Sequence, residues 1–383
     1  MIGYDLLNEP WCGDAFSDGR LLLPGQSGRR LLSPLYNRIH SAIRREEKEG
    51  LVLWEGVTWT HWLPIEGHLL SSLLAYLLKK LPLLSWLRLL SCLGLVQLET
   101  QGKESPEKAL SNLTWVNLPE EWEEHQSAIE RGGLTEDATW VAEENFEESA
   151  DEDWIPAFGT GFTKVPGGEE WRHKSVLSWH YYYPPLTYST TSFPWWHRAL
   201  AHWLFGPGVF LRLEKEARKL GAASLLTEWG IARPDADRPD SWGSIEAAWV
   251  MDRADRQALS WCYWDTEALG VLWNSEGKSI ESAVRYLSRP FPLAVAGNNL
   301  AFTFDPGSST FQASWQIEDK EEKGAAVSLF FLPDHIFASG LEVSLAEGLG
   351  WRRSKESRQV IEVVATSPVV APRKAWLQVK ATN

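Results

Sequence analysis

The first 55 residues alternate short apolar runs with an amphipathic segment. The first run lies within residues 2–10 and stops at Pro10, because proline offers a strand no N–H. Residues 34–49 repeat apolar positions at helical spacing and end at Gly50, and a second apolar run follows at 51–54. Strand, helix and strand in this order predict a parallel sheet with helical connections.

The same alternation returns after residue 175. It predicts strands at 175–179, 222–228 and 258–264, with helices at 209–220 and 246–257. The predicted fold class is therefore α/β, with the strands arranged as in a barrel and active residues expected at their carboxyl ends.

The pattern changes near Arg289-Pro290-Phe291-Pro292. Beyond it, short strands alternate apolar and polar residues and are separated by turns such as Asp305-Pro306-Gly307-Ser308. This predicts two domains, a barrel-type domain over 1–290 and a C-terminal β-sandwich over 291–383.

A long insertion interrupts the first domain at about 61–155. It holds a leucine-rich run, 69–98, and an acidic stretch, 143–153. Charged residues and a proline interrupt the leucine-rich run, which excludes a membrane-spanning helix of roughly 20 residues. Three interpretations stay open: a partly disordered surface excursion, an amphipathic segment that contacts lipid transiently, or non-native sequence.

The composition of the chain limits the classes of molecule that it is expected to bind. The net charge of −14 over 383 residues disfavours nucleic acid and gives no general attraction to an anionic membrane. Three cysteines form neither a disulfide framework nor a metal-binding spacing. The 23 tryptophans suit a cleft for sugar rings, although core packing accounts equally well for many of them. Because Met1 leads directly into the first predicted strand, we expect no signal peptide within these residues.

Two glutamates occupy equivalent places in the predicted barrel. Glu9, in Asn8-Glu9-Pro10, and Glu228, in Thr227-Glu228-Trp229-Gly230, each lie at the carboxyl end of a strand. A pair of carboxyl groups is what glycoside hydrolysis requires. Glu9 suits the acid/base and Glu228 the nucleophile.

Four more residues suit substrate binding. Asn8 is placed to reach the sugar 2-OH, and Trp264 to form a platform for a sugar ring. His180 and Tyr182 lie two residues apart on one strand and so share a face. The Tyr182 hydroxyl can donate to the nucleophile, and His180 can orient the acid/base or the substrate.

These residues resemble the motifs of glycoside hydrolase family 5, and the chain is most similar to its endoglycoceramidases. The closer resemblance rests on four stretches: residues 3–11, Trp54-Glu55-Gly56-Val57-Thr58-Trp59, residues 161–168, and residues 285–297. It implies cleavage of the β-glycosidic bond between glycan and ceramide in glycosphingolipids, with no metal and no cofactor. The substrate would then be a glycosphingolipid or another β-glycoside.

The resemblance also implies an incomplete (β/α)8 TIM barrel. In this family Glu9 would end strand four, Glu228 strand seven, and Trp264 would belong to strand eight. We therefore expect roughly 90 residues with three βα units to precede Met1 in a longer parent. That parent is expected to be active and secreted or lysosomal, and this chain to be inactive or nearly so.

Two alternatives stay open at this point. One is a non-catalytic protein that binds glycolipids or glycans through an aromatic cleft. The other is a glucosylceramidase or a β-glucanase of the same family, which would differ in its products.

Overall fold

The structure of the chain, a computed structural model, describes most residues outside the long insertion. The described residues are 2–23, 25–57, 96–98, 113–115, 159–182, 195–230, 233–265, 272–318 and 323–382. By internal packing the chain divides into two units, Met1–Gly67 with Phe158–Asn383, and His68–Ala157. The predictions for residues 61–155 lie outside the described residues, apart from two short strands.

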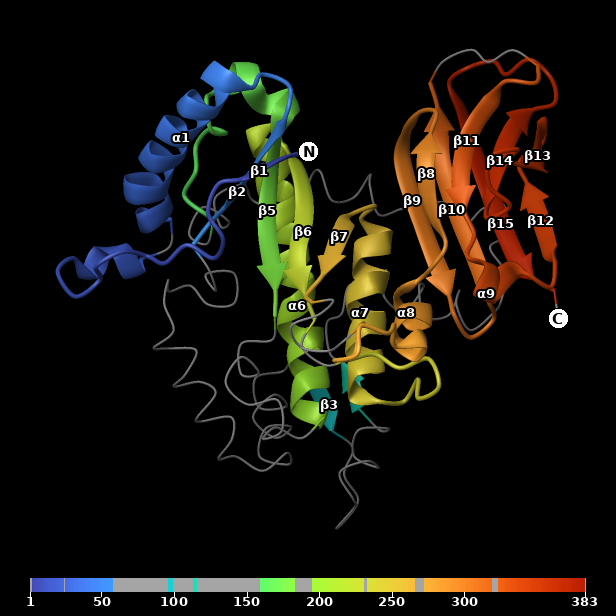
Figure 1. The fold of residues 1–383 in the computed structure, drawn as a ribbon, viewed down its shortest axis with the longest axis horizontal. Coiled ribbons are helices and arrows are strands. Elements are labelled where there is room, and N and C mark those ends of the chain that lie inside the picture. The colour runs from blue at the N-terminus through green and yellow to red at the C-terminus, as the bar shows by residue number, and fades with distance from the viewer. Residues whose placement is uncertain are drawn as a thin grey trace, which may run out of the picture. The chain divides into compact units, whose positions relative to one another are not determined.

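Five strands of the first unit form one parallel sheet in the order β1-β2-β5-β6-β7 (Figure 1). The strands are β1 (Gly3–Asp5), β2 (Leu51–Glu55), β5 (Ser175–Tyr181), β6 (Ala223–Trp229) and β7 (Ser260–Tyr263). This sheet confirms the predicted fold class, because it is a parallel half-barrel followed by an antiparallel β-domain.

Within the described residues, helices connect β1 to β2, β5 to β6 and β6 to β7, as the parallel order requires. The longer ones are α1 (Ser33–Glu46), α6 (Trp195–Leu220), α7 (Trp242–Arg256) and α8 (Glu281–Leu287). Short helical turns lie at η1 (Gly19–Leu22), η2 (Gly28–Leu32), η4 (Glu169–Lys174) and α9 (Asp334–Phe337).

Helix α6 begins 14 residues before the predicted helix 209–220 and has 26 residues. A glycine inside a helix usually weakens it, but Gly206 here faces the Trp249 ring of α7. A Cβ at Gly206 would lie 2.2 Å from that ring. The missing side chain therefore lets α6 and α7 approach each other closely.

Strand β1 is shorter than the predicted strand 2–10. Its pairing with β2 ends where the Leu6 N–H donates to the Leu53 carbonyl, 3.1 Å away. Glu9 lies beyond that point, in a left-handed backbone conformation with φ of 44°. The prediction of a strand over residues 2–10 is thus wrong in its extent, because the strand ends at Asp5 and Glu9 lies in the segment that follows it.

The C-terminal residues form two four-stranded antiparallel sheets, in the orders β12-β15-β10-β9 and β13-β14-β11-β8. Their strands are β8 (Phe291–Val295), β9 (Asn298–Asp305), β10 (Thr310–Ile317), β11 (Ala326–Phe331), β12 (Leu341–Leu345), β13 (Leu349–Arg353), β14 (Val360–Ala365) and β15 (Arg373–Ala381). Burial alternates residue by residue along β10, so one face of its sheet packs into a core that includes Phe311, Trp315 and Phe330.

Helix α7 packs against β9 next to a buried ion pair. The guanidinium of Arg289 lies 2.6 Å from a carboxylate oxygen of Asp255, and it also donates to the Phe304 carbonyl. Both side chains of the pair are less than 10% exposed. The pair therefore joins the end of α7 to the start of the C-terminal β-domain.

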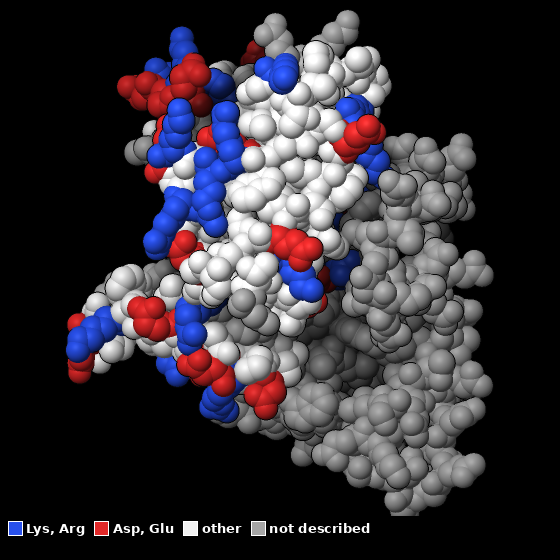
Figure 2. Space-filling model, turned by 90° about the vertical axis from the view of Figure 1, so that its right-hand side faces the viewer, with Lys and Arg blue, Asp and Glu red and all other residues white. Residues whose placement is uncertain are grey.

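In the second unit, β3 (Val96–Leu98) and β4 (Leu113–Trp115) pair antiparallel. Within the described residues, no helix combines the length and apolarity needed to cross a bilayer. Figure 2 shows one face of the molecule, on which Lys and Arg gather along one margin with Asp and Glu among them. Most of the centre of this face carries neither charge.

Candidate active site

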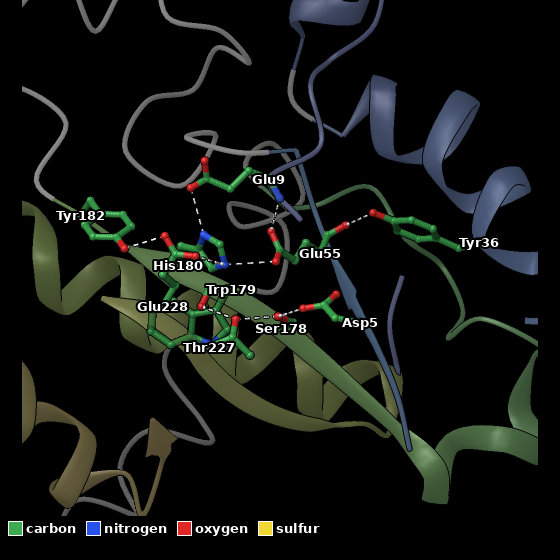
Figure 3. A network of polar contacts seen from close by, with 10 residues as sticks. All are labelled: Asp5, Glu9, Tyr36, Glu55, Ser178, Trp179, His180, Tyr182, Thr227 and Glu228. Atoms are coloured by element: carbon green, nitrogen blue, oxygen red, sulfur yellow. Dashed lines mark hydrogen bonds and ion pairs between the residues drawn. The ribbon is translucent and has the colours of Figure 1, made fainter. Parts of the chain in front are cut away.

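The carboxyl ends of β1, β2, β5 and β6 meet at one edge of the parallel sheet (Figure 3). The register of β5 against β6 shifts after Trp179, where Thr227 of β6 is the extra residue of a bulge, and His180 becomes the direct neighbour of Glu228. Bulges of this kind commonly aim a side chain at an active site. The local irregularity thus brings an imidazole against one of the two predicted catalytic carboxylates.

His180 lies between both predicted catalytic glutamates. Its Nδ1 is 2.9 Å from Oε1 of Glu9, and its Nε2 is 3.6 Å from Oε2 of Glu228. Ligand-type atoms of Glu9, His180 and Glu228 all lie within 4.8 Å of one another. The two carboxyl groups are therefore about as close as in retaining glycosidases, where they are ~5 Å apart, and closer than in inverting ones.

A third carboxylate, Glu55 at the end of β2, contacts both Glu9 and His180. One of its oxygens lies 3.1 Å from Nε2 of His180, and the other accepts a hydrogen bond of 3.1 Å from the Glu9 N–H. Its backbone carbonyl accepts from the Tyr36 hydroxyl on α1, 3.1 Å away. Glu55 is only 4% exposed, so these contacts take the place of water.

Tyr182 reaches Glu228 from the other side. Its hydroxyl donates a hydrogen bond of 2.6 Å to Oε1 of Glu228. Behind Glu228, the hydroxyls of Thr227 and Ser178 lie 2.6 Å apart and link β6 to β5. These bonds fix the direction in which the Glu228 carboxyl points.

The carboxylates around His180 control its charge. Burial alone would lower the pKa of His180, but the contacts with Glu55, Glu9 and Glu228 outweigh burial and raise it to about 10. Nδ1 lies at hydrogen-bond distance from Glu9 and Nε2 at ion-pair distance from Glu55, an arrangement that favours a proton on both nitrogens. Together with the raised pKa, this favours the imidazolium form of the ring at neutral pH.

Burial raises the pKa of both Glu55 and Glu228. For Glu55 the contact with His180 works against this rise, and for Glu228 the hydrogen bond from Tyr182 does so. Burial, together with the contact with Glu228, also raises the pKa of Tyr182, which keeps its hydroxyl a donor. The site thus holds several protons whose positions depend on one another.

Among the described residues, one group has ligand atoms close enough together to hold a metal ion. It consists of Glu9, His180 and Glu228. The ligand atoms of these three residues already have protein partners. His180 contacts Glu9 and Glu55, and Glu228 accepts a hydrogen bond from Tyr182. We therefore interpret the cluster as a proton-transfer site.

The remaining predicted site residues lie at the margin of this cluster. Asn8 directly precedes Glu9 and is exposed. Trp264 follows β7, is 47% exposed, and donates its backbone N–H to the Trp229 carbonyl of β6 at 2.8 Å. Both side chains are thus open to solvent at the same end of the sheet, as a substrate-contacting residue needs to be.

Glu55 is not among the residues that the sequence predicts for the site. A signal for it exists, because Glu55 ends an apolar run in the same way as Glu228 does. Carboxyl ends of parallel strands share one edge, so a third glutamate at such an end belongs to the same place.

Comparison with known proteins gives matches to one family. Residues 289–379 match the glycoside hydrolase family 5 C-terminal domain. The chain is 22% identical over 363 residues to an endoglycoceramidase of Cyanea nozakii, which covers 92% of this chain and 49% of that protein. An endoglycoceramidase of Hydra vulgaris is 22% identical over 339 residues, covering 86% and 42%.

Among solved structures, endo-glycoceramidase II from Rhodococcus matches all of this chain and 60% of its own, with a TM-score of 0.53 and 16% identity. That likeness shows the fold. The fold and the family match define the chain as a relative of the glycosidases. Its C-terminal residues carry the glycoside hydrolase family 5 C-terminal domain, the chain as a whole is similar to endoglycoceramidases, and it spans about half the length of the curated relatives it matches.

Proposed function

We propose that this site cleaves the β-glycosidic bond between glycan and ceramide in glycosphingolipids, with retention of configuration. The observation that carries the proposal is the approach of the Glu9 and Glu228 carboxyl groups to within 4.8 Å across His180. Such a separation leaves no room for a water molecule between the carboxylate and the sugar. An inverting mechanism needs that water molecule, and a retaining mechanism does not.

In the first step, a carboxylate oxygen of Glu228 attacks the anomeric carbon, and the bond from that carbon to the ceramide oxygen breaks. Glu9 gives its proton to the leaving oxygen. In the second step, Glu9 takes a proton from water, the water oxygen attacks the anomeric carbon, and the bond to Glu228 breaks. Tyr182 holds Glu228 in line, and the His180 imidazolium stabilises the Glu9 carboxylate that forms between the two steps.

The substrate class rests on similarity. Structures of the Rhodococcus enzyme include a ganglioside GM3 complex and a lactosyl-enzyme intermediate. For this chain we propose the same class of substrate, with Asn8 and Trp264 at the sugar. A secreted or lysosomal location of the whole protein belongs to the same proposal.

The test is hydrolysis of a fluorescent glycosphingolipid by this chain and by any longer form that its gene encodes. Intact oligosaccharide and ceramide are the expected products. An activated aryl glycoside then separates the two roles. Glu9→Gln should still form a glycosyl-enzyme, seen as a mass increase on the peptide with Glu228, whereas Glu228→Gln should form none.

Other products would redirect the proposal. Release of free glucose indicates a glucosylceramidase, and release of short glucans indicates a β-glucanase. Binding of glycolipid without turnover, unchanged in Glu228→Gln, indicates a non-catalytic glycan-binding protein.

A further inference from the structure

Glu55 is the least exposed of the three carboxylates in the site. Its side chain is 5% exposed, against 13% for Glu228 and 32% for Glu9. A carboxylate so far from solvent is stable only where charged or hydrogen-bonding groups meet it. The groups that meet Glu55 both belong to the catalytic arrangement.

The first contact holds the backbone of Glu9. The Glu9 N–H donates to Oε2 of Glu55 over 3.1 Å. Glu9 has a φ of 44°, in the left-handed region that residues with a side chain rarely adopt. A hydrogen bond from this N–H to a fixed carboxylate stabilises the unusual turn that directs the Glu9 side chain.

The second contact holds the ring of His180. Oε1 of Glu55 faces Nε2 at 3.1 Å, and Nδ1 on the opposite side of the ring faces Oε1 of Glu9 at 2.9 Å. Contacts therefore run from Glu55 to the Glu9 backbone, and from Glu55 through His180 to the Glu9 carboxyl group. Figure 3 shows this closed circuit of three side chains.

We propose that Glu55 is a positioning residue, which fixes the direction of the Glu9 carboxyl group through the Glu9 backbone and the His180 ring. The proposal deepens the proposed function and rests on it as far as catalysis is concerned. Glu55 itself lies behind Glu9 and His180 and needs no contact with substrate.

Glu55 also keeps the second proton on His180. Other titratable groups face this ring or Glu55 from the neighbouring strands, and a change at Glu55 is read against them. They are Glu9, Glu228, Tyr182 and Asp5, with Tyr36 of α1 against Glu55. Glu9 and Glu228 still face the ring when Glu55 is neutralised. Glu55 is nevertheless the nearer carboxylate to Nε2, at 3.1 Å against 3.6 Å for Glu228.

The experiment uses the whole chain, with histidines labelled by nitrogen-15 and the His180 signal assigned by its loss in His180→Gln. In the unsubstituted chain the His180 ring should keep both protons through neutral pH. In Glu55→Gln its titration midpoint should fall toward the ordinary histidine value of ~6.5, and Glu55→Asp should fall between the two. Glu216→Gln is the matched control, since Glu216 of α6 also accepts a backbone N–H, that of Thr160.

Kinetics give the second measurement. Glu55→Gln should lower kcat by roughly tenfold or more, with little change in KM, because a displaced acid/base slows the reaction without loosening substrate. A His180 ring that titrates in the ordinary range in the unsubstituted chain overturns the proposal, as does a midpoint unchanged in Glu55→Gln. A shifted midpoint in a chain without hydrolase activity supports the positioning contact and counts against the proposed function alone.

Discussion

The Tyr182 hydroxyl and the Glu228 carboxylate are joined by a hydrogen bond of 2.6 Å, although 46 residues separate them in the chain. Parallel pairing of β5 with β6 makes this possible, because it brings the carboxyl ends of the two strands together. The bond opposes the rise in the pKa of Glu228 that burial causes.

The first prediction concerns this bond. In Tyr182→Phe the pKa of Glu228 should rise further, because the donor that stabilises its ionised form is lost. The nucleophile must be ionised, so the acidic limb of kcat/KM should move to higher pH, and kcat should fall by about 10- to 100-fold. Tyr286→Phe removes a 2.6 Å hydrogen bond to the Ser244 carbonyl and is the control. An acidic limb that stays in place would count against the assignment of Glu228 as nucleophile.

The second prediction concerns stability against pH. The pKa of His180 is about 10 in the folded chain and ~6.5 when unfolded, so folding favours the protonated ring. The stabilisation is fully present below pH ~6.5 and is lost as pH rises toward 10. Denaturant unfolding should show a fall in the free energy of unfolding over this range that is smaller in His180→Gln. Equal falls in both chains would mean that His180 is not held as an imidazolium.

The third prediction concerns Trp264. If its exposed ring supports a sugar, Trp264→Ala should raise KM by roughly tenfold and lower kcat less, because a platform contributes to binding in both the ground and transition states. Trp376→Ala is a matched control, since Trp376 on β15 is 40% exposed, close to the 47% of Trp264. Equal effects of both substitutions would show that the change is one of general stability.

The fourth prediction concerns the junction of the two domains. Arg289→Ala leaves the Asp255 carboxyl group buried without its partner, and should lower the free energy of unfolding by about 3 to 5 kcal/mol. The exposed pair Arg285 and Asp237 has a similar distance, 2.7 Å. Arg285→Ala should therefore cost less than about 1 kcal/mol. Chemical denaturation of both variants checks the difference.

Much of the strand order follows from the sequence. The apolar runs predicted at 51–54 and 222–228 correspond to β2 and β6, and the alternation in residues 311–315 lies within β10. Such strands can be predicted because a strand buried on both faces is a continuous apolar run, and a strand buried on one face alternates apolar and polar residues. The six residues proposed for the site lie at or beside one edge of the sheet for the same reason.

Other features depend on tertiary contacts and could not be read in advance. The turn at Glu9 is held by a hydrogen bond to Glu55, which is 46 residues away. The length of α6 depends on the close approach of Trp249 to Gly206. The charge of His180 depends on three carboxylates from three different segments. The boundary at residues 290–291 and the catalytic roles stay predictions.

The neighbouring positions of β2 and β5 have a consequence for how the molecule tolerates change. These strands pair directly, yet β2 ends at Glu55 and β5 begins at Ser175. The intervening polypeptide leaves one strand and returns to its hydrogen-bonded partner, and the entropy of closing such a loop grows only with the logarithm of its length. The register of β2 against β5, from Val52 with Ser175 to Glu55 with Ser178, therefore sets the spacing of Glu55 and His180, whatever number of residues joins the two strands.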